Sequence, residues 1–203
     1  SVTNEYLDAI QLAPHSHKKL STSKEFQKWH DEFSPILLEQ LLHSKLSLDK
    51  MVPEVLLVTG RSRLENWLKA FRPMGKKVSE LLGVRYFMRS GLYEDITGTI
   101  GTKPLLIVCN DTFTATELLR SDDEAKACEH LRWVVVDLSA VPGDIVELQL
   151  AIEQDESLRC VFVTGLEQAE SCRELHDSGA EQIYVAPDDV GVLGPRSTIA
   201  SAG

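Results

Sequence analysis

The chain has 203 residues, of which 43% are hydrophobic and 26% charged, and its 31 acidic and 21 basic side chains give a formal net charge of −10. This composition excludes a disordered chain, a collagen-like repeat and a disulfide scaffold, and the acidic balance argues against nucleic acid or an anionic membrane surface as the main partner. No apolar run approaches the roughly 20 residues of a membrane span. We therefore expect a cytoplasmic protein without a signal peptide.

The first 50 residues are predicted to form a linker and a helical segment. Residues 1–22 are polar and weakly periodic, and the His15–His17 pair among them has no further ligand cluster nearby, so we expect a solvated loop and no metal site. Over residues 23–46 the apolar side chains recur at helical spacing. Ser34-Pro35 interrupts this pattern, and proline is favoured in a first helical turn, so we expect two short helices or one kinked helix.

From residue 52 onward, apolar strands alternate with amphipathic helices. Strands are predicted at 54–58, 84–88, 105–109, 133–137, 160–164 and 182–185. Helices are predicted between them at 62–71, 76–82, 114–120, 144–154 and 167–178. The strands are continuous apolar runs, which are typical of a parallel sheet covered on both faces. We therefore predict an α/β domain over 51–203, with a doubly wound parallel sheet and any ligand site at the carboxyl ends of the strands.

Motifs for common cofactors and metals are absent from these strand ends. No GxGxxG follows the first strand, and the nearest approach to a phosphate-binding loop, Gly98 to Lys103, has the wrong spacing and leads into a strand. The four cysteines contain no CxxC pair, and we expect buried free thiols in a reducing compartment: Cys109, Cys128, Cys160 and Cys172. We predict no metal site and no cofactor.

Three strand-end features in the last third occur in a fixed order. Asp137 ends an apolar strand and is followed by the turn residues of 142–144, and Thr164 ends the next strand. Ala186 and a proline then follow the last strand, in the segment DSGAEQIYVAPDDVGVL. At these intervals the chain resembles the receiver domains of two-component signalling. The resemblance covers residues 53–190 and leaves 72–103 as an insertion.

The resemblance implies a flavodoxin-like or CheY-like fold of about five strands, with an N-terminal helical extension and the insertion before the second core strand. It also implies that Asp137 is the phospho-acceptor position, with Thr164 as the hydroxyl beside it. Receivers hold Mg²⁺ with an acidic pair and balance the phosphoryl charge with a lysine. Here the pair is replaced by Thr59 and Gly60, and the lysine by Ala186. We therefore expect no enzyme but a pseudo-receiver, with Mg²⁺ involved only if phosphorylation is retained.

Arg61 is the cation that we expect near this site. It follows the first strand, and an Arg61–Asp137 ion pair would mimic the neutralised state of the carboxylate. Asp111 follows the second core strand and is the other charged candidate at this edge of the sheet.

After Pro187 the chain has little helical periodicity, so the fifth helix of a receiver is missing or very short. Either the N-terminal helices cover that face of the sheet or a second copy of the chain does so. The candidates are the apolar residues Phe26, Trp29, Phe33, Leu37, Leu38, Leu41 and Leu42. The insertion 72–103 contributes either an extra edge strand or a partner-binding loop.

Three functions remain open from the sequence. The first is a pseudo-receiver of a hybrid histidine kinase or atypical response regulator, which contacts a signalling domain in cis or in trans. The second is a functional receiver in a phosphorelay that uses Asp137. The third is a degenerate nucleotide-binding, helicase-like lobe, with WVVVD as its acidic strand and CVFVTG as the next strand. The missing phosphate-binding loop argues against the third.

Overall fold

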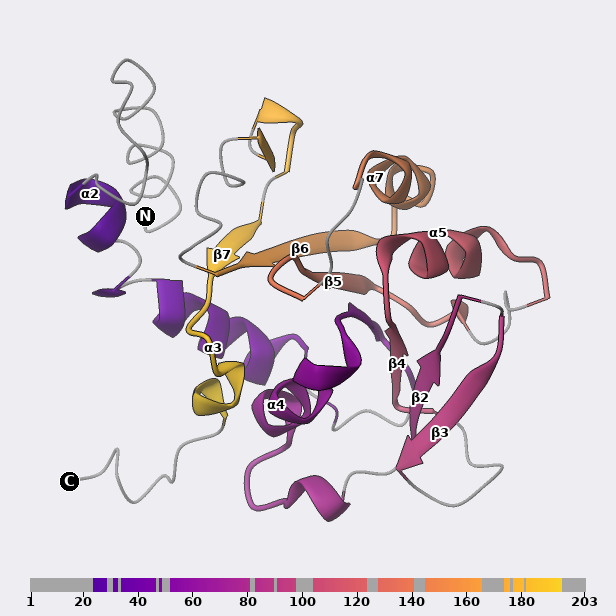
Figure 1. The fold of residues 1–203 in the computed structure, drawn as a ribbon, viewed down its shortest axis with the longest axis horizontal. Helices are drawn as coiled ribbons and strands as arrows, with labels where there is room; N and C mark the ends of the chain where they lie inside the picture. Colours follow the sequence, from indigo (N-terminus) through magenta and orange to yellow (C-terminus); the bar gives the residue numbers. More distant parts are fainter. Residues whose placement is uncertain are drawn as a thin grey trace.

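The chain folds around a single sheet with helices on both faces (Figure 1). The computed structural model describes residues 24–28, 31–32, 34–46, 48, 52–80, 83–89, 91–97, 104–123, 128–140, 145–165, 174–175, 177–180 and 182–194. Within these residues the sheet has seven strands in the order β3-β2-β4-β1-β5-β6-β7. Neighbouring strands are parallel except β2 and β3, which form an antiparallel pair. The predicted α/β class with a mostly parallel sheet is confirmed.

All six predicted strands are present, each within one residue of its expected ends. The strands are β1 (Val55–Val58), β2 (Val84–Phe87), β3 (Tyr93–Thr97), β4 (Leu106–Cys109), β5 (Trp133–Asp137), β6 (Arg159–Thr164) and β7 (Ile183–Val185). The expected size of about five strands is wrong, because the insertion 72–103 contributes both β2 and β3 to the sheet edge. The sequence did not indicate β3, whose YEDIT run is short and interrupted by charges.

The described helices are α2 (Lys24–Lys28), α3 (Ser34–Ser44), α4 (Arg61–Phe71), α5 (Thr112–Arg120) and α7 (Val146–Glu153), with the 3₁₀ turns η3 (Val78–Glu80) and η5 (Val190–Leu193). The N-terminal segment is helical, as predicted, over the described residues of α2 and α3. The predicted helix 76–82 is wrong over its described part, which forms only the single turn η3. The predicted helix 167–178 lies mostly outside the described residues.

The sheet separates two hydrophobic cores. Leu56 and Val58 of β1 face one core, which α5 and α7 close. Val55 and Leu57 face the other, which α3, α4 and η5 close. Side chains of β1, β4 and β5 are therefore buried on both faces, which explains their unbroken apolar runs. Each such side chain contributes about 1.5–3 kcal/mol on burial.

Helix α3 packs against β7 and η5 and covers this end of the sheet, where the described part of the chain after β7 forms only the short turn η5 (Figure 1). Leu38 and Leu42 are fully buried in the core shared with α4. The Ser34 hydroxyl donates to the Val185 carbonyl at 3.0 Å and accepts from the Val185 amide at 2.9 Å, so it occupies the place of a neighbouring strand. The expectation that N-terminal residues cover this face is confirmed for α3. The structure does not describe the side chain of Phe26 or the residues Trp29 and Phe33.

The β2–β3 hairpin extends the sheet beyond β4. Arg85 of β2 pairs with Asp95 of β3 at 3.0 Å across the hairpin. Of the two roles left open for the insertion, an extra strand or a partner-binding loop, the described residues form strands: β2 pairs with β4, and β3 lies at the edge. Among the described helices, none is long and apolar enough to cross a membrane.

Candidate functional site

Between β1 and β5, successive strands stop being added on one side of the sheet and begin to be added on the other. The carboxyl ends of these two strands therefore flank a topological switch point. From β1 the chain proceeds to β2 and β4 on one side, and later to β5, β6 and β7 on the other. The helices α4 and α5 pack into different cores on opposite faces of the sheet. Doubly wound folds bind ligands in the crevice at such a point. Thr59 directly follows β1 and Asp137 ends β5, so two of the predicted site residues meet here.

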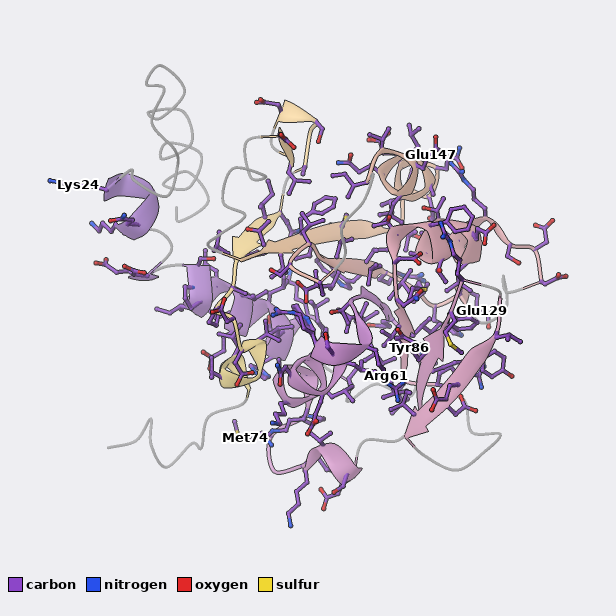
Figure 2. The ribbon with its side chains drawn as sticks, viewed as in Figure 1. Lys24, Arg61, Met74, Tyr86, Glu129 and Glu147 are labelled. Carbon is purple, nitrogen blue, oxygen red and sulfur yellow. The ribbon has the colours of Figure 1, made fainter. Side chains whose placement is uncertain are left out.

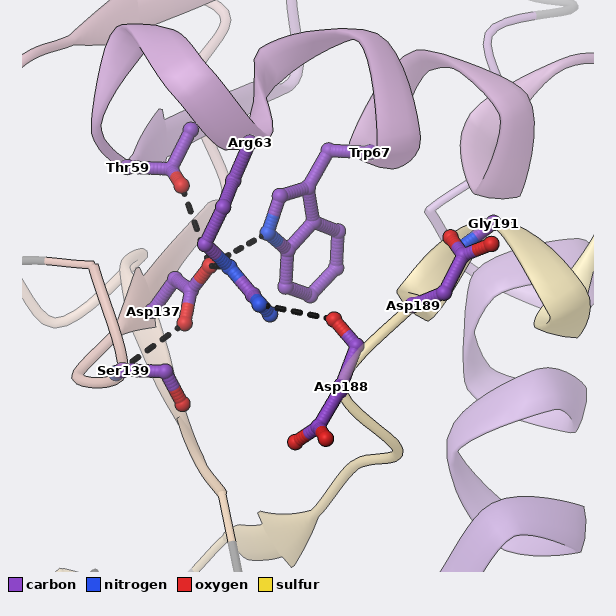
Figure 3. Close-up of polar contacts among 8 residues, drawn as sticks. All are labelled: Thr59, Arg63, Trp67, Asp137, Ser139, Asp188, Asp189 and Gly191. Carbon is purple, nitrogen blue, oxygen red and sulfur yellow. Dashed lines mark hydrogen bonds and ion pairs between the residues drawn. The ribbon is translucent and has the colours of Figure 1, made fainter.

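Asp137 is fully buried and accepts four hydrogen bonds at this point (Figure 3). Its Oδ2 atom accepts from Thr59 Oγ1 at 3.0 Å, from Arg63 Nε at 2.7 Å and from Trp67 Nε1 at 2.6 Å. Its Oδ1 atom accepts from the Ser139 amide at 3.1 Å. Both oxygens therefore have protein donors, and one oxygen has three of them.

Arg63 provides the positive charge beside Asp137. It lies in the first turn of α4, and Trp67 lies one turn later on the same face of that helix. Arg63 also donates from Nη1 to the carbonyl of Asp188 at 2.8 Å, and its side chain is 18% exposed. One guanidinium therefore joins the strand-end carboxylate of β5 to the segment that follows β7.

Arg61, the expected partner of Asp137, is placed elsewhere. Its guanidinium pairs with Glu94 at 3.4 Å and lies 5.3 Å from the ring centre of Tyr86, near which Figure 2 shows it. Arg61 and Arg63 are two residues apart, which rotates them by about 200° around a helix. The hypothesis of a neutralising arginine after β1 identified the right kind of residue and the wrong position. The spacing of Arg63 and Trp67, one turn apart on the helix after β1, was the missed signal.

The other expected site residues line closely packed loops. Thr164 is buried at the end of β6, and its carbonyl accepts from the amide of the buried Ala186 at 2.9 Å. A side-chain carbon at Gly60 would lie 3.3 Å from the Ala140 carbonyl. One at Gly165 would lie 3.0 Å from the Ser139 hydroxyl. The loops after β1, β5 and β6 are therefore in close contact.

These contacts limit the chemistry of the site. A nucleophilic carboxylate needs a free lone pair and a path for its electrophile, and Asp137 is fully buried. Arg63 balances one negative charge, whereas phosphorylation would convert the carboxylate of Asp137 into an acyl phosphate with a total charge of about −2. The described residues contain no group of three His, Cys, Asp or Glu side chains that could hold a metal ion. The arrangement is a buried ion pair between Arg63 and Asp137 at the end of β5, with further donors on both carboxylate oxygens.

Asp111 and Cys109 lie at the end of the next strand, β4. The Asp111 carboxylate caps α5 by accepting from the Thr114 amide at 2.7 Å. Burial raises the pKa of the Cys109 thiol well above its ordinary value, and the nearby Cys128 and Asp111 add to this shift. Cys109, Cys128 and Cys160 are free thiols, as predicted, although only Cys109 is fully buried. Cys172 lies outside the described residues.

Comparisons of the chain with protein-family models, curated proteins and solved structures gave no match. The function must therefore be argued from the geometry around Asp137 and from the surface of the fold.

Proposed function

We propose that this chain is a receiver-like signalling module that acts by protein–protein contact, independently of phosphorylation and without a cofactor. The observation that carries the proposal is the state of Asp137. Its buried carboxylate accepts from Arg63 at 2.7 Å and from Trp67 at 2.6 Å, both on the same oxygen. Because both oxygens of this buried carboxylate already accept from protein donors, the centre has no place for a phosphoryl group.

The order of the strands supports the receiver-like part of the proposal. The five strands β4-β1-β5-β6-β7 are adjacent in that order. Numbered along the chain among themselves, they run 2-1-3-4-5, which is the order of flavodoxin-like domains, receivers included. The distribution of helices is consistent with two covered faces, with α4 and η5 on one and α5 and α7 on the other.

Arg63 has a defined role in this proposal. In a working receiver a cation and a metal ion neutralise the phosphorylated carboxylate, and the change is transmitted to the partner surface. Here Arg63 neutralises Asp137 permanently and holds the Asp188 carbonyl at 2.8 Å. The segment after β7 is therefore tied to the centre by the protein's own side chains, so it can hold its position without phosphorylation.

The experiment is a titration with beryllofluoride, a phosphoryl mimic, in the presence of Mg²⁺, followed by amide chemical shifts around Asp137 and Thr164. We expect no shift at millimolar concentration. A saturable, Mg²⁺-dependent shift that disappears in Asp137→Asn would contradict the proposal, because the site would then accept a phosphoryl group.

A second candidate is a degenerate nucleotide-binding, helicase-like lobe, which strand β2 favours. Helix α4 leads from β1 to β2, which lies beyond β4, so the parallel part of the sheet has six strands. A five-stranded receiver connects its first helix to the strand beside β1. In this candidate Asp137 ends the acidic strand, and Thr164 ends the next one. Saturable amide shifts at residues 60–61 and 138–140 with Mg²⁺–ATP would favour this lobe, and their absence would count against it.

A further inference from the structure

A groove of about 1030 Å³ lies between the β2–β3 hairpin and α5. It opens at the carboxyl ends of β2 and β4, and none of the residues that contact Asp137 line it. Phe87 and Met88, at the end of β2, line it together with Phe113 and Leu118 of α5. The groove is therefore a separate feature at the edge that the insertion adds to the sheet.

The groove exists because the sheet extends further than the helix that covers it. α5 has nine residues and packs on β4 and β1, whereas β2 and β3 continue the sheet beyond β4. Leu92 is 65% exposed, Tyr93 50% and Phe113 47%. The Tyr93 ring lies 5.4 Å from the ring of Phe87 at the groove. Exposed apolar side chains gathered beside a groove are typical of an interaction site.

The charges around the groove favour a cation. Its lining carries four carboxylates, Asp111, Glu117, Asp123 and Glu147, and two guanidinium groups, Arg89 and Arg120. Asp111 caps α5, and Glu147 pairs with Arg120 at 3.2 Å. In the part of the chain that the structure describes, Glu117 and Asp123 are exposed and have no ion-pair partner. Two carboxylates therefore remain available beside the apolar lining.

The aromatic lining adds exposed apolar surface beside these carboxylates. The guanidinium of Arg89 lies over the Phe113 ring, 4.9 Å from its centre. This contact places a cation of the chain itself on one face of the Phe113 ring, while 47% of the residue stays exposed. A lysine or arginine of a partner can pair with Glu117 or Asp123 while its neighbours bury the exposed part of Phe113.

We propose that this groove binds a basic, amphipathic segment of a partner protein. An apolar anchor packs against Phe113 and Phe87, and a lysine or arginine pairs with Glu117 or Asp123. The proposal rests on the proposed function as an interaction module and names the chemistry of its partner. This mode of recognition combines an apolar anchor with charge complementarity.

The probes are three synthetic peptides of about 14 residues, the length of an amphipathic recognition helix. One has a leucine face and a lysine face, the second replaces lysine by glutamate, and the third replaces leucine by serine. We expect the leucine–lysine peptide alone to produce saturable amide shifts at residues 87–89 and 112–120. Its affinity should fall at least about fivefold in Phe113→Ala, and also in the double variant Glu117→Gln with Asp123→Asn.

Two controls separate specific binding from adhesion. Val192→Ala removes a side chain that is 60% exposed on η5, and Glu65→Gln removes an exposed carboxylate of α4, both on the opposite face. Neither should change the affinity. Equal binding of the leucine–glutamate peptide, equal effects of the control variants, shifts confined to other residues, or no binding at all would each overturn the proposal.

Failure of the groove and failure of the proposed function give different results. If the peptides do not bind and beryllofluoride causes no shift at Asp137, the groove assignment is wrong and the interaction module stands with another surface. If beryllofluoride binds at Asp137, the proposed function is wrong whatever the peptides do.

Discussion

At the scale of single residues, two arginines of one helix have very different surroundings. Arg61 pairs with Glu94 where both side chains are more than half exposed, at 53% and 55%. Such surface pairs contribute about 0–1 kcal/mol, because water and salt screen them. Arg63 pairs with a carboxylate that is fully buried and that also accepts from Thr59 and Trp67. Removing one member of such a buried network leaves the remaining groups without partners.

The first prediction concerns Asp137→Asn. The substitution keeps the shape of the side chain and removes the charge opposite Arg63, and an amide group turned toward Trp67 would oppose its N–H donor. We expect the free energy of unfolding to fall by about 2–4 kcal/mol, somewhat less than for a fully buried pair because Arg63 is partly exposed. Urea denaturation measures the change.

The matched control is Glu94→Gln, which breaks the exposed pair with Arg61 on the same helix. It should change the free energy of unfolding by less than about 1 kcal/mol. Equal effects of the two substitutions would show that the Asp137 centre contributes no more than a surface ion pair.

At the scale of elements, α3 both covers one face of the sheet and bonds the backbone of its edge strand β7. Its apolar residues enter the core with α4, and Ser34 at its start bonds both backbone groups of Val185 on the edge strand β7. An edge strand otherwise presents unpaired backbone groups that invite pairing with another chain. At the other end of α3, the Leu193 carbonyl accepts from His43 Nε2 at 3.0 Å, which fastens η5 as well.

The second prediction concerns Ser34→Ala. The buried amide and carbonyl of Val185 both lose their partner, and we expect a loss of about 2–3 kcal/mol in unfolding free energy. Hydrogen exchange of the Val185 amide should become faster by the factor to which this loss of free energy corresponds. Ser44→Ala is the control, because Ser44 lies on the same helix and bonds only the Gln40 carbonyl at the surface. Val185 exchange that is unchanged in Ser34→Ala would contradict the assigned role.

The strands were predictable from the sequence, because continuous apolar runs in this chain are buried on both faces. The helix expected at 76–82 fails for local reasons: Gly75 has a φ of 81°, and the neighbouring residues 76, 77, 79 and 80 are all exposed, so a helix would bury little there. The spacing of Arg63 and Trp67 shows only that they share a helix face, so the choice between Arg61 and Arg63 needed the structure as well. It depends on the rotation of α4 about its axis, which the packing of Trp67 in the core determines.

At the scale of the whole molecule, the crevice where a doubly wound fold usually binds its ligand is filled by its own side chains. Arg63 and Trp67 reach into it from α4, and the loops after β1, β5 and β6 close around Asp137. Residues available to partners lie instead at the β2–β3 edge and on α5. The sequence identified Asp137, Thr59 and Thr164 as residues of one sheet edge, but the filling of that edge depends on contacts between distant segments.

The third prediction tests whether the N-terminal segment and the sheet unfold together. Leu42 of α3 is fully buried in the core that also contains Leu57 and Val135. Leu42→Ala should lower the free energy of unfolding by about 2–5 kcal/mol. Hydrogen exchange of the Leu57 and Val135 amides should accelerate by the factor that this loss predicts. Ile36→Ala, at a residue of the same helix that is 54% exposed, is the control. Unchanged protection of the central strands in Leu42→Ala would show that α3 unfolds separately.

The Asp137 centre also has a consequence for how this chain can evolve. Mutating Arg63 alone leaves a buried carboxylate without its cation, and mutating Asp137 alone leaves a cation without its carboxylate. Each single step toward a reactive site therefore passes through a destabilised protein. Related chains should vary at positions 63 and 137 together or not at all. A lineage that has acquired this pair can change it only by two substitutions together or through an unstable intermediate.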